Sequence, residues 1–235
     1  MTEKHLSTQF DAELSGISTR VLEMGGLAEA QVAQSLYALT NFSAETADQV
    51  LRQEERVNAM EVDIDRDLSS IIARRQPTAR DLRLLIAISK TIANLERVGD
   101  EAARIARTVQ RLINTGVSSR LRLPVNDLAY ESDLAIAQLR KALDAFARLD
   151  VAKAIEVLKQ DDQIDQEFEG LMRKLITFMM EDPRTISSSI DLIFVAKAIE
   201  RVGDHAKNLA EVIIYVVKGT DVRHNPVQTV ESMVQ

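Results

Sequence analysis

The sequence of 235 residues contains no cysteine. This absence excludes disulfide bonds, thiolate metal sites and cysteine nucleophiles. Only 8 glycines and 4 prolines occur. Because these two residues are the strongest helix breakers, their scarcity in a chain rich in Ala, Leu, Glu and Arg favours helix almost throughout. We therefore predict an all-α protein.

Membrane insertion and nucleic-acid binding are also disfavoured. No run of about 18 consecutive apolar residues occurs, and residues 1–5 (MTEKH) lack the pattern of a signal peptide. The formal net charge of −7 and the pI near 5.1 leave no basic face that could displace counterions from nucleic acid. We expect a cytoplasmic protein without direct membrane insertion, whose acidity suits cations or basic protein surfaces.

Apolar residues that recur at three- and four-residue steps divide the chain into six expected helices. Their approximate ranges are 10–41, 44–76, 79–113, 125–149, 151–180 and 187–218. Ser43 is expected to act as an N-cap, Thr78 to begin a weak capping box, and Gly219 to act as a C-cap. Gly25 and Gly26 are unusual inside a helix, and they indicate a bend or the close approach of another backbone.

The second half of the chain repeats the plan of the first. Similar short stretches recur with a nearly constant offset, and a helix-ending proline follows in each half, at Pro77 and at Pro183. We interpret this pattern as a tandem repeat of two antiparallel three-helix bundles. The predicted organisation is a first bundle over 1–115, a linker over 116–123, a second bundle over 124–219 and a tail over 220–235.

The pentapeptide Glu-Arg-Val-Gly-Asp occurs twice, at Glu96–Asp100 and at Glu200–Asp204, each time inside an expected helix. Residues four apart lie on the same side of a helix with Cβ atoms about 6 Å apart, so each motif presents two carboxylates as a pair. Two like charges this close repel each other unless a cation lies between them. The duplicated pair therefore indicates a cation site in each half.

A second set of oxygen-bearing side chains is expected opposite each pentapeptide. Asp161 and Asp165 lie four apart on the fifth helix, and the repeat places Glu54 and Asn58 at the equivalent positions of the second helix. In an antiparallel hairpin these side chains can face the pentapeptides. Carboxylates suit magnesium, calcium, manganese or iron, whereas zinc is less natural without His or Cys. The candidate metal ligands are Glu54, Glu96, Asp100, Asp161, Asp165, Glu200 and Asp204.

Two other residue types inside the pentapeptides each have two interpretations. Gly99 and Gly203 lower helix propensity beside the acidic pairs, where the missing side chain would admit either a metal cluster or a neighbouring helix. Arg97 and Arg201 are either neutralising partners of the acidic pairs or simply exposed residues.

His205 and Asn208 follow the second pentapeptide. His205 is offset by about 100° on the helical wheel from Asp204, and we expect it on the surface, whereas Asn208 continues the acidic row as a further candidate ligand. Acidic residues four apart are most often only a solvated helix face. The metal interpretation is favoured because the same five residues recur at matching points of two halves whose surrounding sequence has diverged.

Three further stretches accompany the pentapeptides, namely residues 74–83 (RRQPTARDLR), 88–92 (ISKTI) and 179–182 (MMED). Together they resemble the PhoU family, the phosphate-transport accessory proteins of bacteria, over nearly the whole chain. The resemblance implies two three-helix bundles, Glu/Asp-x-x-x-Asp motifs that bind multinuclear metal clusters, and frequent homodimers. Its implied cofactors are metal ions bound by carboxylates, with iron, manganese, magnesium and zinc as the alternatives.

The role that the resemblance implies is regulatory and not enzymatic. A protein of this kind is expected to signal phosphate sufficiency as a negative regulator of the phosphate-starvation response. The implied partners are the ATPase subunit of the phosphate ABC transporter and the sensor histidine kinase of the phosphate regulon. The protein would then lie at the inner membrane only through these partners.

Two alternatives differ from this interpretation. A di-iron enzyme built in a helical bundle would carry Glu-x-x-His motifs, and neither pentapeptide has a His at that spacing. A metal-independent helical scaffold, whose acidic faces dock protein partners, remains the main alternative. One departure from the family pattern is Asn58, where an acid would be the fuller ligand. We therefore predict that the second bundle binds metal more tightly than the first.

Overall fold

The computed structural model describes residues 8–77, 79–116 and 124–234. Within these ranges every regular element is helical, so the predicted all-α class is confirmed. None of the described helices combines the length and the apolar character that crossing a bilayer requires. The elements are α1 (Thr8–Asn41), α2 (Ala44–Arg75), α3 (Ala79–Asn114), α4 (Val125–Arg148), α5 (Val151–Glu181), the 3₁₀ turn η1 (Pro183–Thr185), α6 (Ile186–Lys218) and α7 (Val227–Val234).

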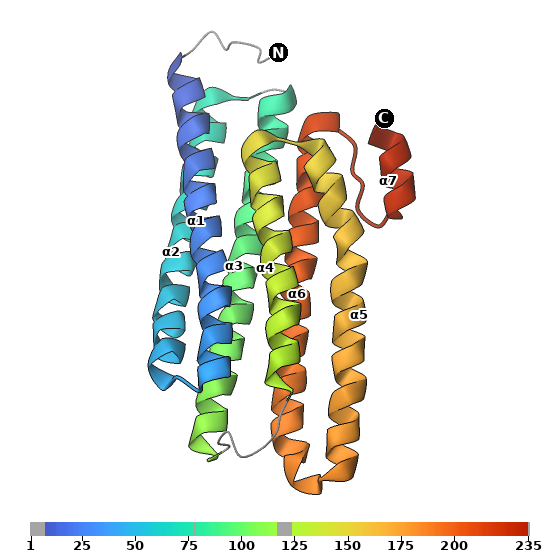
Figure 1. The fold of residues 1–235 in the computed structure, drawn as a ribbon. Coiled ribbons are helices and arrows are strands. Elements are labelled where there is room, and N and C mark those ends of the chain that lie inside the picture. Colours follow the sequence, from blue (N-terminus) through green and yellow to red (C-terminus); the bar gives the residue numbers. More distant parts are fainter. Residues whose placement is uncertain (1–7, 78, 117–123, 235) are drawn as a thin grey trace.

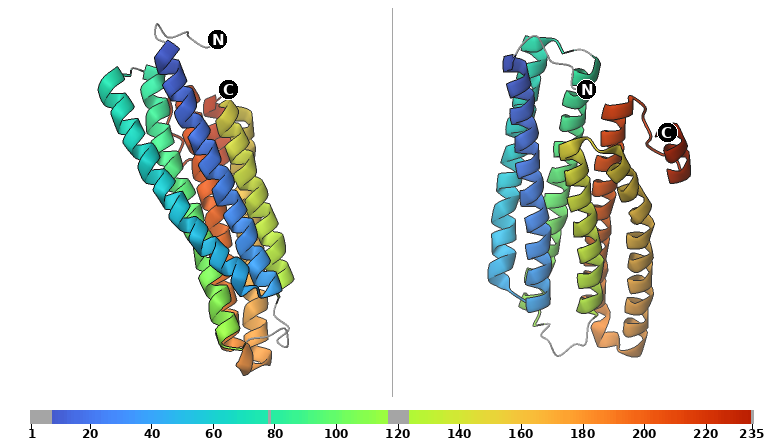
Figure 2. Two further views of the ribbon diagram at one scale, coloured as in Figure 1. Left: turned by 90° about the vertical axis from the view of Figure 1, so that its left-hand side faces the viewer. Right: turned by 45° about the horizontal axis from the view of Figure 1, so that its top comes forward.

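The six long helices form two antiparallel three-helix bundles that lie side by side (Figure 1). α3 packs against α6 and α1 packs against α4, while α2 and α5 lie at the outer edges. Figure 2 shows from two further directions that the long helices share one approximate axis. One continuous hydrophobic core contains residues from all six helices. The tandem-bundle prediction is confirmed, whereas the residue boundaries of the two bundles stay predictions, and 117–123 of the expected linker lie outside the described residues.

The repeat extends to the backbone of the turn between the first two helices of each bundle. Phe42 and Leu149 occupy equivalent positions with φ of 48° and 50°. Each is followed by a residue whose side chain caps the next helix, Ser43 for α2 and Asp150 for α5. The predicted N-cap at Ser43 is confirmed, while the capping box expected at Thr78 lies outside the described residues.

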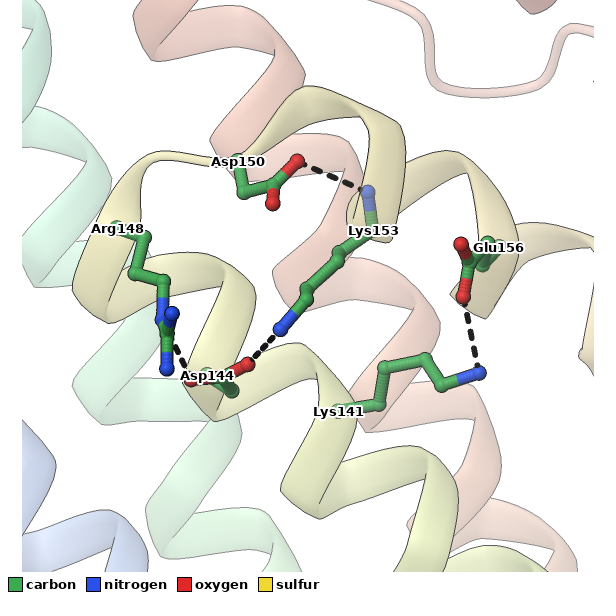
Figure 3. Close-up of polar contacts among 6 residues, drawn as sticks. All are labelled: Lys141, Asp144, Arg148, Asp150, Lys153 and Glu156. Atoms are coloured by element: carbon green, nitrogen blue, oxygen red, sulfur yellow. Dashed lines mark hydrogen bonds and ion pairs between the residues drawn. The ribbon is translucent and has the colours of Figure 1, made fainter.

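Polar contacts hold the α4–α5 turn together (Figure 3). The Asp150 carboxylate accepts a hydrogen bond of 3.1 Å from the backbone N–H of Lys153. The Lys153 ammonium group in turn pairs with Asp144, which also accepts a hydrogen bond of 2.9 Å from Arg148. These contacts tie the last turn of α4 to the first turn of α5. Arg148 at the end of α4 and Asp150 at the start of α5 also complement the partial charges of those helix ends.

The glycines singled out in the sequence differ in what they do. A Cβ atom at Gly25 would overlap with Cδ2 of Leu143 on α4, so Gly25 permits close packing of α1 on α4. The neighbour that approaches is a side chain and not the expected backbone, and a Cβ at Gly26 would meet nothing. Gly219 ends α6 with φ of 76°, and its N–H donates to the Tyr215 carbonyl, which confirms the predicted C-cap.

The segment expected to be a tail contains α7, a short helix that the sequence analysis did not predict. α7 packs against α5, Val230 is buried, and the Glu231 carboxylate forms an ion pair with Lys159 of α5. Pro226 directly precedes the helix, and proline is favoured at helix starts. Eight residues are too few to show a clear periodic pattern. A helix this short is also marginal by itself, so α7 depends on its tertiary contacts.

Candidate metal centres

The first acidic cluster consists of Glu54 and Glu61 on α2 and Glu96 and Asp100 on α3. Burial raises the pKa of Glu96, and the negative charges of Asp100 and Glu61 raise it further. Glu54 acts on Glu96 in the same direction. Burial, then Asp65, then Asp100 raise the pKa of Glu61. Glu54, Asp100 and Glu61 thus all lie within electrostatic reach of Glu96, and Glu61 was not among the predicted ligands.

The second acidic cluster consists of Asp161 and Asp165 on α5 and Glu200 and Asp204 on α6. Burial and then the negative charge of Asp161 raise the pKa of Asp165, with Glu200 contributing. Burial raises the pKa of Asp204, and Glu200 and Asp161 raise it further. All four residues predicted for this half therefore lie within electrostatic reach of one another, on the two helices that the repeat indicated.

Lysine side chains partly neutralise the second acidic cluster. Lys207 pairs with Asp161, which is buried, and Lys197 lies 2.6 Å from Glu200. Both lysines belong to α6, so the helix that carries the pentapeptide also carries its counter-charges. A cation entering the cluster would compete with these two ammonium groups for the same carboxylates.

The donor set of both clusters fits a hard cation, because every acidic side chain in them offers oxygen. The Oε2 atom of Glu200 is buried and has no hydrogen-bond partner among the described residues. Over the same part of the chain, no three acidic or imidazole side chains converge closely enough to form a metal site by themselves. Glu96 with Asp100, or Glu200 with Asp204, would hold the ion, and the facing helix and water would complete its coordination.

The pentapeptide glycines make room inside each bundle. A Cβ atom at Gly99 would lie 3.2 Å from Oε1 of Gln31 on α1, and one at Gly203 would lie 3.1 Å from Oε1 of Gln138 on α4. Gln31 and Gln138 are buried, and each donates a hydrogen bond of 3.1 Å to a backbone carbonyl of the neighbouring outer helix. Of the two interpretations, the structure therefore favours close packing with neighbouring helices.

The prediction that His205 lies on the surface is wrong, because its side chain is half-buried between the bundles. Nδ2 of Asn94 donates to the Lys90 carbonyl, so Oδ1 of Asn94 is the acceptor that faces His205 and Asn208. Burial and then the positive charge of Arg201 lower the pKa of His205 to about 4. The neutral imidazole therefore donates from Nδ1 to Oδ1 of Asn94. Nδ2 of Asn208 donates to the same oxygen, so both hydrogen bonds join the two bundles.

The arginines of the pentapeptides differ from each other. Arg201 reaches across from α6 to Glu101 on α3, with 2.8 Å between Nη1 and Oε1. Arg104 pairs with the other oxygen of Glu101 at 3.2 Å. Glu101 is buried, so Arg201 stabilises the contact between the bundles, whereas Arg97 is exposed. Arg201 is therefore neither a partner of its own acidic pair nor a simple surface residue.

A further acidic residue, Glu131 on α4, was not found by the sequence analysis. Its side chain is 1% exposed, and neither carboxylate oxygen has a hydrogen-bond partner in the described part of the chain. Burial raises the pKa of Glu131 to about 8, with Glu200 and Glu167 as the contributing charges. A signal of its burial was available in the sequence, because three of its neighbours at steps of three and four, Leu128, Leu134 and Ala135, are apolar, and the repeat aligns Glu131 with Met24.

The two clusters are expected to bind metal with different affinities. Glu54 is held by Arg107, with 2.8 Å from Nη2 to each carboxylate oxygen, much as Asp161 is held by Lys207. The difference lies at the next step of the helix, where the first cluster has the neutral amide of Asn58 and the second has the carboxylate of Asp165, so the second cluster should bind more tightly. Titration of the metal-free protein with Mn²⁺ should show two classes of site, and the tighter class should disappear in Glu200→Ala/Asp204→Ala. Equal affinities for the two classes would refute this prediction.

Comparison with known proteins places the chain in a family. The model of the PhoU domain matches residues 21–109 and again residues 130–213. The chain belongs to the PhoU family. The two matches coincide with the two bundles, and each contains one pentapeptide. The pentapeptides that carried the resemblance in the sequence therefore lie in the parts that define the family.

Relatives and solved structures agree with this assignment. The chain is 50% identical over 224 residues to a phosphate-specific transport system accessory protein PhoU homolog of Burkholderia sp, covering 95% of both chains. It is 45% identical over 221 residues to the phosphate-specific transport system accessory protein PhoU of Escherichia coli K12, covering 94% of this chain and 90% of the relative. The crystal structure of PhoU from Pseudomonas aeruginosa superposes with a TM-score of 0.83 at 43% identity, covering 90% of this chain and all of the other.

A more distant structure preserves the same fold. The phosphate transport system regulatory protein PhoU from Streptococcus pneumoniae has a TM-score of 0.83 at 27% identity, and the match covers 91% of this chain and 99% of that one. The tandem-bundle arrangement is thus the fold of the family, and the shape is retained where most side chains differ.

Proposed function

We propose that this protein is a negative regulator of the phosphate-starvation response that acts as a metal-binding adaptor in the cytoplasm. Its partners in this proposal are the ATPase subunit of the phosphate ABC transporter and the sensor histidine kinase of the phosphate regulon. The protein would modulate phosphate uptake and hold the kinase in its inhibitory state when phosphate is plentiful. It would reach the inner membrane only through these partners, and it would act without catalysing a reaction.

The proposal rests on the duplicated acidic cluster in a PhoU chain. Relatives of high identity are named as accessory proteins of phosphate-specific transport, which supports a role in regulating that transport. Burial is the main cause that raises the pKa values of Glu96 and Asp204, and neighbouring carboxylates raise both further, so each cluster holds negative charges that repel one another. A cation would relieve this repulsion, and its remaining coordination positions would be open to an acidic or phosphate group of a partner.

A second candidate function is a metal-independent helical scaffold. The pairing of Lys207 with Asp161 and of Lys197 with Glu200 favours it, because these lysines already neutralise part of the second cluster. In that case the acidic faces would serve only to dock basic surfaces of partner proteins. A homodimer is compatible with both candidates, and it belongs to the proposal through the family resemblance.

Deletion of the gene followed by complementation tests the proposal. A reporter of the phosphate-starvation response should be active in phosphate-rich medium in the deletion strain and silent when the parent chain is restored. Glu200→Ala/Asp204→Ala should leave the reporter active. The matched control Glu156→Ala/Glu169→Ala removes two exposed acids from α5 and should restore silencing. Full silencing by the cluster variant would refute the need for its carboxylates, and a silent deletion strain would refute negative regulation.

A further inference from the structure

The core of the second bundle contains a carboxyl group that its packing does not explain. Glu131 is 1% exposed, and both Oε1 and Oε2 lack a hydrogen-bond partner among the described residues. An ionisable group buried in this way is costly, because neither solvation nor pairing compensates its charge. The first bundle has Met24 at the equivalent position, where it is fully buried. The fold therefore has no need of a carboxylate at this point.

The surroundings of Glu131 are acidic on two sides. Its electrostatic neighbours are Glu200 on α6 and Glu167 on α5, and both act on it as negative charges. Glu131 therefore lies within electrostatic reach of acidic residues on both helices that carry the second acidic cluster. Oε2 of Glu200 is also buried without a partner among the described residues. α4 and α6 thus carry three buried oxygen atoms that have no hydrogen-bond partner in the described part of the chain, on two glutamates within electrostatic reach of each other.

Oxygen atoms from several helices, with no donor to satisfy them, are the donor set that a hard divalent cation takes. Because burial raises its pKa to about 8, Glu131 is mostly protonated and neutral at pH 7 when no cation is bound. A bound cation would displace this proton and supply the positive charge that lets the carboxylates of Glu131, Glu167 and Glu200 lie close together. A buried water could satisfy the oxygens by hydrogen bonding, but it would leave Glu131 in its neutral form.

We propose that Glu131 is an interior ligand of a divalent cation, Mg²⁺ or Mn²⁺, which it holds together with Glu200 and Glu167. This inference rests on the proposed metal binding and deepens it. Glu200 then belongs both to the surface pair with Asp204 and to the interior site, whereas the first bundle has Met24 in place of an interior ligand. The glutamates close on the ion by side-chain rotation, since no three of them converge in the described structure.

Titration with Mn²⁺ alone tests the assignment. All proteins compared carry Glu96→Ala/Asp100→Ala, so that only the second bundle can bind through its pentapeptide. Adding Glu131→Gln, which keeps the shape and removes the charge, should weaken Mn²⁺ binding by about 10-fold or more. Adding Glu169→Gln instead changes an exposed acid of α5 and should leave the affinity unchanged. Glu131→Met, which copies the residue of the first bundle, should weaken binding to the same degree and provides a second variant if glutamine impairs folding.

Thermal unfolding separates this role from a purely structural one. A structural role predicts that the Glu131 variants unfold at lower temperature with and without metal. A ligand role predicts that, in chelator, they unfold at the temperature of the background protein or above it, and that only they lose the rise in unfolding temperature on adding Mn²⁺. Unchanged Mn²⁺ affinity in both variants would overturn the interior site and leave the proposed function intact. Absence of Mn²⁺ binding in the background protein itself would overturn both.

Discussion

In the metal-free protein, Glu131→Gln is expected to become more stable than the parent as the pH rises, because only the parent loses free energy of unfolding when Glu131 ionises. The pKa of Glu131 is raised from 4.5 to about 8, mainly by burial. When the pKa of a carboxyl group is higher in the folded state than in the unfolded state, its contribution to stability is fully present at pH values below the unfolded-state pKa. The contribution is lost as the pH rises through the folded-state pKa. Since one pKa unit corresponds to about 1.4 kcal/mol, the variant should gain about 3 kcal/mol on the parent between pH 5 and pH 8.

Urea unfolding at pH 5, 6, 7 and 8 in the presence of a chelator measures this gain. At pH 5 the two proteins should be nearly equally stable, because glutamine and the protonated acid are both neutral and similar in shape. Glu169→Gln removes an exposed charge from the same bundle and should change stability by about 0.5 kcal/mol or less at every pH. A constant difference between parent and Glu131→Gln across this range would show that the carboxyl group is not buried as described.

Arg201→Ala is expected to destabilise the protein by about 2 to 4 kcal/mol at pH 7, because it removes a partner from a buried carboxylate. Arg201 approaches Glu101 to 2.8 Å across the contact between the bundles, and Glu101 is 2% exposed. Arg104 remains as a second partner at 3.2 Å, which keeps the loss below that of a fully isolated charge. The effect should appear in the midpoint of urea unfolding.

A double-mutant comparison separates the ion pair from general packing. Glu101→Gln/Arg201→Ala removes the buried charge together with its partner, so it should be more stable than Arg201→Ala alone. Arg173→Ala breaks an exposed pair with Glu169 at 3.5 Å and should cost about 0.5 kcal/mol or less. If Arg201→Ala proved as mild as Arg173→Ala, the contact between α3 and α6 would not depend on this pair.

Much of the fold follows from local sequence signals. The apolar period of the long helices, the N-cap at Ser43 and the C-cap at Gly219 depend on residues close in sequence, and the structure confirms them. The repeat then indicates how the helices combine, because two copies of one plan fold into two copies of one bundle. The acidic pairs were predictable for the same reason, since spacing of four on a helix determines which side chains share a face.

Contacts between the bundles could not be predicted in this way. The engagement of His205 with Asn94, and of Arg201 with Glu101, joins residues about a hundred positions apart in the chain. On a helical wheel His205 is only a polar residue beside an acid, and nothing local indicates that α3 covers it. Short α7 was missed because its stability comes from packing on α5. Glu131, by contrast, could have been placed in the core from the apolar period of its own helix.

Metal binding by the duplicated pentapeptides is best tested by elemental analysis of the untagged protein, purified without chelator. The comparison is with the variant Glu96→Ala/Asp100→Ala/Glu200→Ala/Asp204→Ala. We expect stoichiometric metal in the parent and its loss from a variant that circular dichroism shows to be still helical. Absence of metal from both proteins, even after incubation with Mn²⁺, Fe²⁺ and Mg²⁺, would refute metal binding and leave a helical adaptor whose acidic faces serve protein contacts alone.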